Sequence, residues 1–93
     1  MTDHASIGMI GLGLMGASLS ARLIEAGYTV IGFDIDTDRC MALKAMGGEL
    51  TVSAGDLAAR CRTIIIAVYS ADQVEAVLAE LKRSEKPARS VII

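Results

Sequence analysis

The sequence is short of aromatic residues and of proline. Its 93 residues include no tryptophan, one phenylalanine, two tyrosines and one proline, while alanine, isoleucine, leucine and valine are abundant. This composition suits helices packed on a buried sheet better than a β-sandwich, whose strands favour aromatic side chains. So little proline also argues against a linker or a disordered chain. The length suits one small domain.

Concentrated charge and long apolar runs are also missing. Nine Lys and Arg stand against eleven Asp and Glu, for a net charge of −2, and the largest basic group is the short one within residues 82–89. A nucleic-acid surface is therefore not expected. No apolar run approaches the roughly 20 residues of a membrane span. Residues 1–6 are polar and acidic, unlike a secretory signal. We expect a cytoplasmic protein without nucleic-acid or membrane partners.

Residues that bind metals or act as nucleophiles are few. Cys40 and Cys61 are far apart, lack the spacing of metal ligands and fall within predicted helices, so two reduced thiols are expected. His4 is the only histidine and precedes the first predicted element. No metal site is predicted.

What the sequence does contain is a regular alternation of short apolar runs with helical patterns. Strands are predicted at 7–10, 29–33, 49–52, 63–68 and from 91, and helices at 14–26, 36–46, 53–60 and from 70. The order β-α-β-α-β-α-β-α-β with short connections is typical of an α/β fold. We expect a Rossmann-type doubly wound parallel sheet with strand order 3-2-1-4-5. Residues 1–93 form a single domain in this interpretation, and the final apolar residues begin a strand that the chain does not finish.

Helix faces and caps follow from the same patterns. Leu19, Leu23 and Ala26 share the apolar face predicted for the first helix. The apolar repeat of the last helix consists of Val74, Val77, Leu78 and Leu81. Capping residues are predicted to be Asp36 or Thr37 for the second helix, Ser53 with Asp56 for the third, and Ser70 with Gln73 for the fourth.

Three glycines interrupt the apolar segment between the first strand and the first helix. Gly11, Gly13 and Gly16 form G-x-G-x-x-G within GLGLMG, at a junction typical of dinucleotide-binding proteins. The first glycine permits a tight turn, the second lets the backbone approach a pyrophosphate, and the third lets the helix lie close to the strands. Because the helix start offers N–H groups to phosphates, the predicted cofactor contacts here are Gly11, Leu12, Gly13, Leu14, Met15 and Gly16. A P-loop is excluded, since no Gly-Lys-Ser/Thr comes next. A purely structural turn in another doubly wound protein is the alternative.

Asp34 ends the second predicted strand, in VIGFD. It lies about 20 residues beyond the glycines, where a carboxylate accepts hydrogen bonds from an adenosine ribose. Two alternatives stay open: Asp34 could cap the next helix, and Asp36 could take the ribose role. A carboxylate here would repel the 2′-phosphate of NADP, and Ile35 rather than arginine comes after it, although Arg39 is one helical turn away. The sequence thus favours NAD over NADP.

The stretch IGLGLMGASLSARLIEAGYTVIGFD resembles the N-terminal segment of the β-hydroxyacid dehydrogenases, the family of 3-hydroxyisobutyrate and 6-phosphogluconate dehydrogenases. The shared pattern is G-L-G-x-M-G, a helix ending in A-G-Y and a strand closing on Asp, and the resemblance continues through residues 53–78. It implies an NAD-dependent oxidoreductase, a homo-oligomer, that transfers hydride between nicotinamide and a small 3-hydroxy acid. The Asn-Arg pair that often replaces the acid in NADP-using members is missing.

The resemblance also implies that the loop after the fourth strand borders the cofactor. In AVYSADQV, Tyr69 stands where the family usually has proline. Tyr69, Ser70 and Val74 are predicted cofactor contacts on this side, and Ile35 is one on the other. The family's substrate motif, D-x-[ST], and its catalytic lysine belong to later segments. No catalytic residue is therefore predicted here, and we expect the 93-residue chain to be an inactive, cofactor-binding part of a longer enzyme.

Two other interpretations are kept. GLGLMGASLSA is also similar to the prephenate and arogenate dehydrogenases, which read G-L-G-L-I-G-G-S-L, whereas Met15 and EAGYTVIGFD favour the β-hydroxyacid family. A stand-alone nucleotide-binding regulatory module would share the glycine loop and would differ from the enzyme in the segments beyond Ile93.

Overall fold

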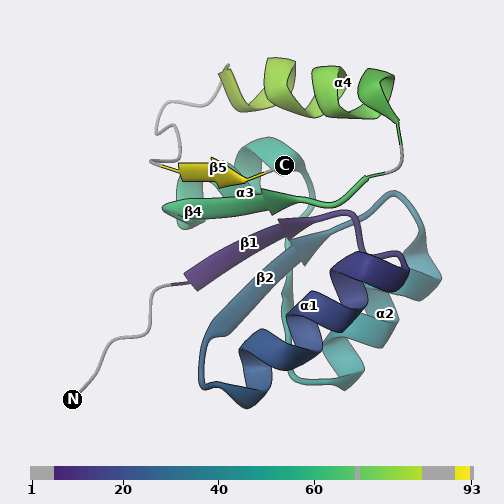
Figure 1. The fold of residues 1–93 in the computed structure, drawn as a ribbon, viewed down its shortest axis with the longest axis vertical. Coiled ribbons are helices and arrows are strands. Elements are labelled where there is room, and N and C mark those ends of the chain that lie inside the picture. The colour runs from purple at the N-terminus through teal and green to yellow at the C-terminus, as the bar shows by residue number, and fades with distance from the viewer. Residues whose placement is uncertain (1–5, 69, 83–89, 93) are drawn as a thin grey trace.

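Strands and helices alternate along the whole chain (Figure 1). The computed structural model describes residues 6–68, 70–82 and 90–92. The elements are β1 (Ser6–Ile10), α1 (Leu14–Glu25), β2 (Thr29–Phe33), α2 (Thr37–Ala45), β3 (Glu49–Leu50), α3 (Ala54–Arg60), β4 (Thr63–Ile66), α4 (Ala71–Lys82) and β5 (Ser90–Ile92). The strands form one parallel sheet in the order β3-β2-β1-β4-β5. The predicted Rossmann-type α/β fold and its strand order are confirmed.

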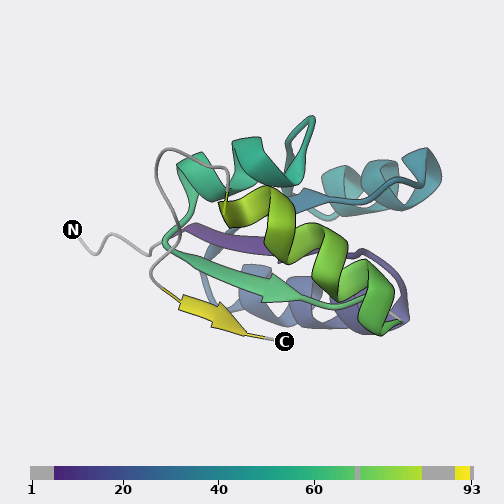
Figure 2. The same cartoon turned by 90° about the horizontal axis from the view of Figure 1, so that it is seen from above.

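Two helices cover each face of this sheet, and each pair packs on a separate cluster of apolar residues. On one face, α1 and α2 pack around Met9, Val30 and Leu43. On the other, α3 and α4 pack around Leu57 and Ile64. Figure 1 shows α1 beside α2 and, on the opposite side, α4 over β4 and β5; in both views β5 lies beside β4 at the edge of the sheet (Figures 1 and 2). Of the helices within the described ranges, none has the length and apolar character needed to cross a membrane.

Side-chain caps fix where α2 and α3 begin. The Asp36 carboxylate accepts hydrogen bonds from the backbone N–H groups of Asp38 (2.9 Å) and Arg39 (3.3 Å). The Ser53 hydroxyl accepts one from the N–H of Asp56 (3.0 Å). These bonds satisfy donors that the first turn of a helix otherwise leaves open. Asp36, one of the two predicted caps of α2, and the predicted Ser53 cap of α3 are confirmed.

Two strands are shorter than predicted. β3 ends at Leu50, because the chain turns into the Ser53 cap after one more bond, from Thr51 N–H to the Gly32 carbonyl (3.1 Å). β4 ends at Ile66 rather than at residue 68. Apolar residues that continue the pattern of a strand can therefore lie outside the sheet.

The buried face of α1 is not the predicted one. Leu19 is 39% exposed and Ala26 is also exposed, whereas Gly16 and Ser20 are buried. Leu23 of the predicted set does pack against the core. The start of the helix lies so close to the sheet that only small side chains fit beneath it.

Ser20 is a polar residue of α1 whose side chain is fully buried. Its hydroxyl oxygen is buried without a hydrogen-bond partner among the described residues. Because an unsatisfied buried hydroxyl costs about 1 to 3 kcal/mol, we expect Ser20→Ala to stabilise the chain by about 1 kcal/mol and to raise Tm by about 4 to 8 °C. Ser18→Ala, at an exposed site of the same helix, is the control for helix propensity in thermal unfolding. Equal stabilisation by both changes would show that the Ser20 hydroxyl carries no such cost.

Both cysteines are free, as predicted. Cys40 lies in α2, but Cys61 comes directly after the last residue of α3 instead of lying within the helix. Burial raises the pKa of the Cys61 thiol; Arg60 opposes this shift and Glu49 adds to it. Cys61 is therefore a neutral core residue near pH 7 rather than a nucleophile.

Candidate functional site

A cleft of about 240 Å³ opens at the carboxyl ends of β1, β2 and β4. Its lining residues are Ile10, Gly11, Gly13, Phe33, Asp34, Ile35, Arg39, Ala67, Val68, Gln73, Ala76 and Val77. The strand order reverses between β1 and β4, so the cleft lies at the topological switch point where doubly wound proteins bind ligands. Gly11, Gly13 and Asp34, which the sequence predicts as cofactor contacts, line it.

The glycine loop is fixed to the strands on both sides of β1. The Gly11 N–H donates to the Phe33 carbonyl (2.9 Å), and the Ala67 N–H donates to the Ile10 carbonyl (2.8 Å). Gly11 has φ +95°, which favours glycine, and a Cβ there would strike the Ala67 carbonyl oxygen. The turn out of β1 thus requires glycine both for its backbone conformation and for space.

The other two glycines of the motif are explained by different constraints. A Cβ on Gly16 would strike the Gly11 carbonyl oxygen, so α1 passes directly against the turn. Gly13 has φ −70° and ψ −163°, an extended conformation open to any residue, and it lines the cleft. Its backbone conformation therefore does not call for glycine, whereas the close approach of a ligand would.

The N-terminus of α1 lacks the side-chain cap that α2 and α3 have. Gly13 occupies the N-cap position without a side-chain hydrogen bond, and the first turn contains no acidic residue. The Gly13 carbonyl accepts the first hydrogen bond of the helix, from the N–H of Ala17 (2.8 Å). The N–H groups of this turn and the positive end of the helix dipole are thus left for an anion at the cleft.

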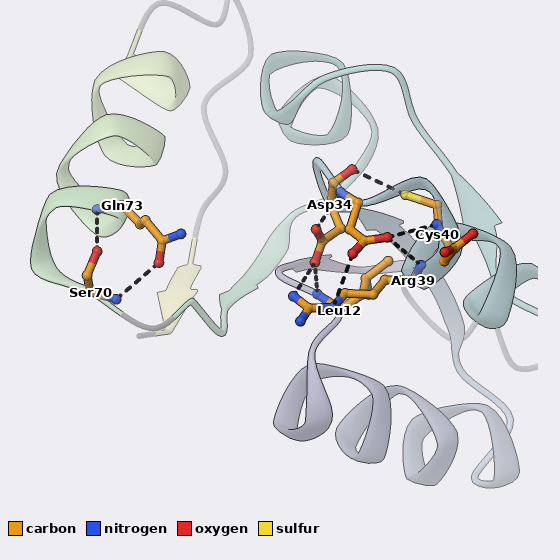
Figure 3. Close-up of polar contacts among 8 residues, drawn as sticks. Leu12, Asp34, Arg39, Cys40, Ser70 and Gln73 are labelled. Carbon is orange, nitrogen blue, oxygen red and sulfur yellow. Dashed lines mark hydrogen bonds and ion pairs between the residues drawn. The ribbon is translucent and has the colours of Figure 1, made fainter.

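Asp34 is the acidic group of the cleft, and two backbone N–H groups orient it (Figure 3). Its Oδ2 accepts from Leu12 (2.7 Å), and its Oδ1 accepts from Asp36 (2.8 Å). The side chain is only 7% exposed. Each carboxylate oxygen has two lone pairs, so one on each stays available for a ribose hydroxyl. Asp36, rather than Asp34, caps α2, and Asp34 lines the cleft whereas Asp36 does not.

Arg39 and Cys40 surround Asp34 from the first turn of α2 (Figure 3). Arg39 Nη1 lies 3.9 Å from Asp34 Oδ2, and Arg39 Nε lies 3.8 Å from Asp36 Oδ2. The Cys40 thiol donates to the Asp34 carbonyl oxygen (3.2 Å). In the described part of the chain, no group of three His, Cys, Asp or Glu side chains could hold a metal ion.

On the α4 side, the predicted capping box is confirmed. The Ser70 N–H donates to Gln73 Oε1 (3.1 Å), and the Gln73 N–H donates to Ser70 Oγ (3.2 Å) (Figure 3). Gln73 lines the cleft, whereas Ser70 lies outside its lining. Val74 packs against the core rather than lining the cleft, which does not fit its prediction as a cofactor contact. Tyr69 lies outside the described residues.

The remaining predicted contacts fall into three groups. Gly11, Gly13, Asp34 and Ile35 line the cleft, and Ile35 is 88% exposed. Leu12 and Gly16 are buried behind the loop. Leu14 and Met15 are exposed at the start of α1. The cleft also has an apolar wall, formed by Ala67, Val68 and Val77. The sequence did not predict this wall, because its pattern places Ala67 and Val68 in a strand and Val77 in the core.

The sequence profile of the NAD binding domain of 6-phosphogluconate dehydrogenase matches residues 6–93. The chain belongs to this family. An L-threonate dehydrogenase of Cupriavidus necator is 36% identical to this NAD-binding domain over 73 residues, which are 78% of the chain and 25% of the relative. The match favours the β-hydroxyacid dehydrogenases over the prephenate and arogenate dehydrogenases.

Solved structures of oxidoreductases share the fold of this NAD-binding domain. A 3-hydroxyisobutyrate dehydrogenase of Mycobacterium tuberculosis superposes with a TM-score of 0.83 at 28% identity, over 89% of this chain and 29% of that one. An imine reductase from Pseudomonas sp. has a TM-score of 0.78 at 30% identity, over 83% and 27%. The chain therefore spans between a quarter and a third of the length of these relatives.

The residues of the cleft fit a nicotinamide dinucleotide. The uncapped N-terminus of α1 offers donors to a pyrophosphate, and Gly13 presents backbone without a side chain. Asp34 offers oriented acceptors at the end of β2. A phosphate donor set and a ribose acceptor therefore border the same cleft.

Proposed function

We propose that this NAD-binding domain serves an oxidoreductase that transfers hydride between NAD and a small 3-hydroxy acid. The observation that carries the proposal is Asp34, whose carboxylate is oriented by two backbone N–H groups in the same cleft that Gly13 lines at the uncapped start of α1. The names of the relatives, L-threonate and 3-hydroxyisobutyrate dehydrogenase, support a hydroxy-acid substrate.

Each part of the cleft has a task in this proposal. The N–H groups from Gly13 to Gly16 bind the pyrophosphate, and Asp34 binds the adenosine ribose through its free lone pairs. Ile35 covers the adenine side, and the segment after β4, which lines the cleft with Ala67 and Val68, borders the nicotinamide half. The bound cofactor supplies or accepts the hydride. The apolar wall of Ala67 and Val68 excludes water from that end of the cleft.

Substrate binding and proton transfer belong, in this proposal, to segments outside the 93 residues. Hydride transfer needs the substrate held against the nicotinamide and a group that moves the hydroxyl proton. To none of the described residues that line the cleft do we assign the binding of the substrate or the transfer of the hydroxyl proton. We therefore propose that the enzyme is a longer chain, as its relatives are. That it is a homo-oligomer and works in the cytoplasm are separate parts of the proposal.

Hydride transfer can be tested on the protein that carries this domain. We expect NAD-dependent oxidation of at least one compound in a panel of 3-hydroxy acids that includes L-threonate, and no turnover by the 93-residue chain. Asp34→Ala should lower kcat/KM about tenfold or more, since a hydrogen bond to a charged group contributes about 1.5 to 3 kcal/mol. Asp56→Ala, which removes an exposed carboxylate in α3, is the control. NAD binding without turnover of any panel member would favour the regulatory module.

A further inference from the structure

One side of the cleft is a face of α4, formed by Gln73, Ala76 and Val77 in the first two turns of the helix. We call these three residues the α4 wall. Of the residues of α4, the buried one is Leu81, in the last turn. Within the described part of the chain, α4 packs chiefly on α3, which lies beside it in Figure 2. The position of the α4 wall therefore depends on how the far end of α4 is held against α3.

Glu80 makes a polar contact at that far end. Its Oε2 accepts a hydrogen bond from the N–H of Gly55, 25 residues earlier in the chain, at 2.6 Å. Gly55 lies in the first turn of α3, where N–H groups have no partner within the helix and the helix dipole is positive. A carboxylate acceptor makes this bond stronger than a neutral one would. Because Glu80 is also half-buried, the bond is a firm link between α3 and α4.

This link joins two helices rather than completing one of them. α3 has a cap of its own, because the Ser53 hydroxyl accepts from the N–H of Asp56 at 3.0 Å. Glu80 follows Val77 by three residues and Ala76 by four, so all three lie on one side of α4. A change in the tilt of α4 at Glu80 would therefore move the α4 wall.

We propose that Glu80 is a positioning residue of the dinucleotide site, whose bond to Gly55 holds the α4 wall at the distance from the glycine loop that a bound cofactor requires. Glu80 itself does not line the cleft. Without the bond, α4 is free to tilt about Leu81, and the cofactor has to order the α4 wall as it binds, which lowers its affinity. This inference rests on the proposed binding of NAD in the cleft.

Three substitutions of Glu80 in the 93-residue chain test the link: Glu80→Ala, Glu80→Asp and Glu80→Gln. Each variant is titrated with NAD by NMR, and hydrogen exchange of the Gly55 amide is measured without NAD. Glu75→Ala is the charge control, an exposed acidic residue of α4 outside the cleft lining. Cys61→Ala is the stability control, because it weakens the same apolar cluster without touching the link. All titrations are made below the lowest Tm in the set.

We expect Glu80→Ala and Glu80→Asp to weaken NAD binding about fivefold. Alanine has no acceptor, and aspartate is one methylene too short to keep both the bond and the spacing of the helices. Glu80→Gln keeps an acceptor oxygen at the same reach and should stay within about twofold of wild type. The Gly55 amide should exchange faster in the alanine and aspartate variants. Since removing a negative charge favours an anionic ligand, the loss in Glu80→Ala cannot come from charge alone.

Both controls should bind NAD as wild type does, although Cys61→Ala lowers Tm. Unchanged NAD affinity in Glu80→Ala and Glu80→Asp would overturn the inference, and the aspartate variant decides alone if the alanine variant does not fold. An equal loss in Cys61→Ala would also overturn it, because stability would then be the cause. These two results leave the proposed cofactor site intact, whereas a wild-type chain that binds no NAD contradicts that site as well.

Discussion

Replacing Gly16 with alanine is expected to destabilise the chain by about 3 kcal/mol, although the same change inside a helix usually stabilises it by about 1 kcal/mol. Gly16 is the third residue of α1, and a Cβ there would strike the carbonyl oxygen of Gly11. The carbonyl belongs to the tight turn that leaves β1, where Gly11 has φ +95° and its N–H is bonded to Phe33. Neither the helix nor the turn can move without losing backbone hydrogen bonds.

Gly55→Ala is the matched control for this prediction. Gly55 also lies in the first turn of a helix, α3, but a Cβ there would make only ordinary contacts, 3.6 Å from Glu80 Oε2 and 3.9 Å from Ser53 Oγ. Its replacement should be neutral or stabilising by up to about 1 kcal/mol. Chemical denaturation of both variants measures the difference. A Gly16→Ala chain as stable as Gly55→Ala would contradict the close packing of α1 on the turn.

The features that the sequence predicted well are those set by local pattern. The order of elements follows from the change between strand and helix periodicity, and the strand order is the one typical of a Rossmann-type sheet. The caps at Asp36, Ser53 and Ser70 were also predicted, because a capping side chain binds an N–H only two or three residues away. Such bonds are visible in the spacing of residue types alone.

The buried face of α1 was not predictable from the same kind of pattern. An apolar stripe of Leu19, Leu23 and Ala26 satisfies the helical period, yet Leu19 is 39% exposed and Ala26 is exposed as well. The close approach at Gly16 determines which face turns inward, and Ser20, one turn later, is buried with it. The tight contact between α1 and the glycine loop therefore decides which face of α1 is buried, and the apolar pattern of the helix does not.

Besides its proposed role as ribose ligand, Asp34 makes a structural hydrogen bond to a residue distant in the sequence. Its carboxylate binds the N–H of Leu12, 22 residues earlier in the chain. The motif predicts a ribose acceptor at this position, but nothing in the spacing predicts a hydrogen bond back to the glycine loop. The consequence is that the proposed ribose ligand also helps to hold the proposed phosphate loop.

The cleft is thus held in shape by the protein itself. Gly11 is bonded to the end of β2, Ile10 to the residue after β4, and Leu12 to Asp34. A ligand that finds its donors and acceptors already in place does not lose binding energy to ordering them. This argues that the loop binds its ligand with little rearrangement, and that a side chain added within it would act by steric exclusion.

Replacing Gly13 with valine is accordingly expected to abolish NAD binding, with a loss of affinity of about 100-fold or more, while the chain stays folded. Gly13 is extended, at φ −70° and ψ −163°, so valine can adopt its backbone conformation. Loss of an N-cap glycine should cost at most about 1 kcal/mol of stability. The added side chain would occupy the place where the pyrophosphate meets the first turn of α1, and the phosphates would lose several charge-assisted hydrogen bonds together.

NMR titration with NAD and thermal unfolding, performed on the same samples, separate this effect from that of Gly16→Ala. Gly13→Val should lose binding with a nearly unchanged Tm, whereas Gly16→Ala should lose stability first.

Gly13→Ser is a third informative variant. A serine at the N-cap accepts hydrogen bonds from the free N–H groups of α1, so this change should raise Tm slightly and still weaken the binding of NAD. Affinity for NAD within a few-fold of wild type in Gly13→Val would place the pyrophosphate away from this turn, because no bound phosphate could share that space with a valine side chain.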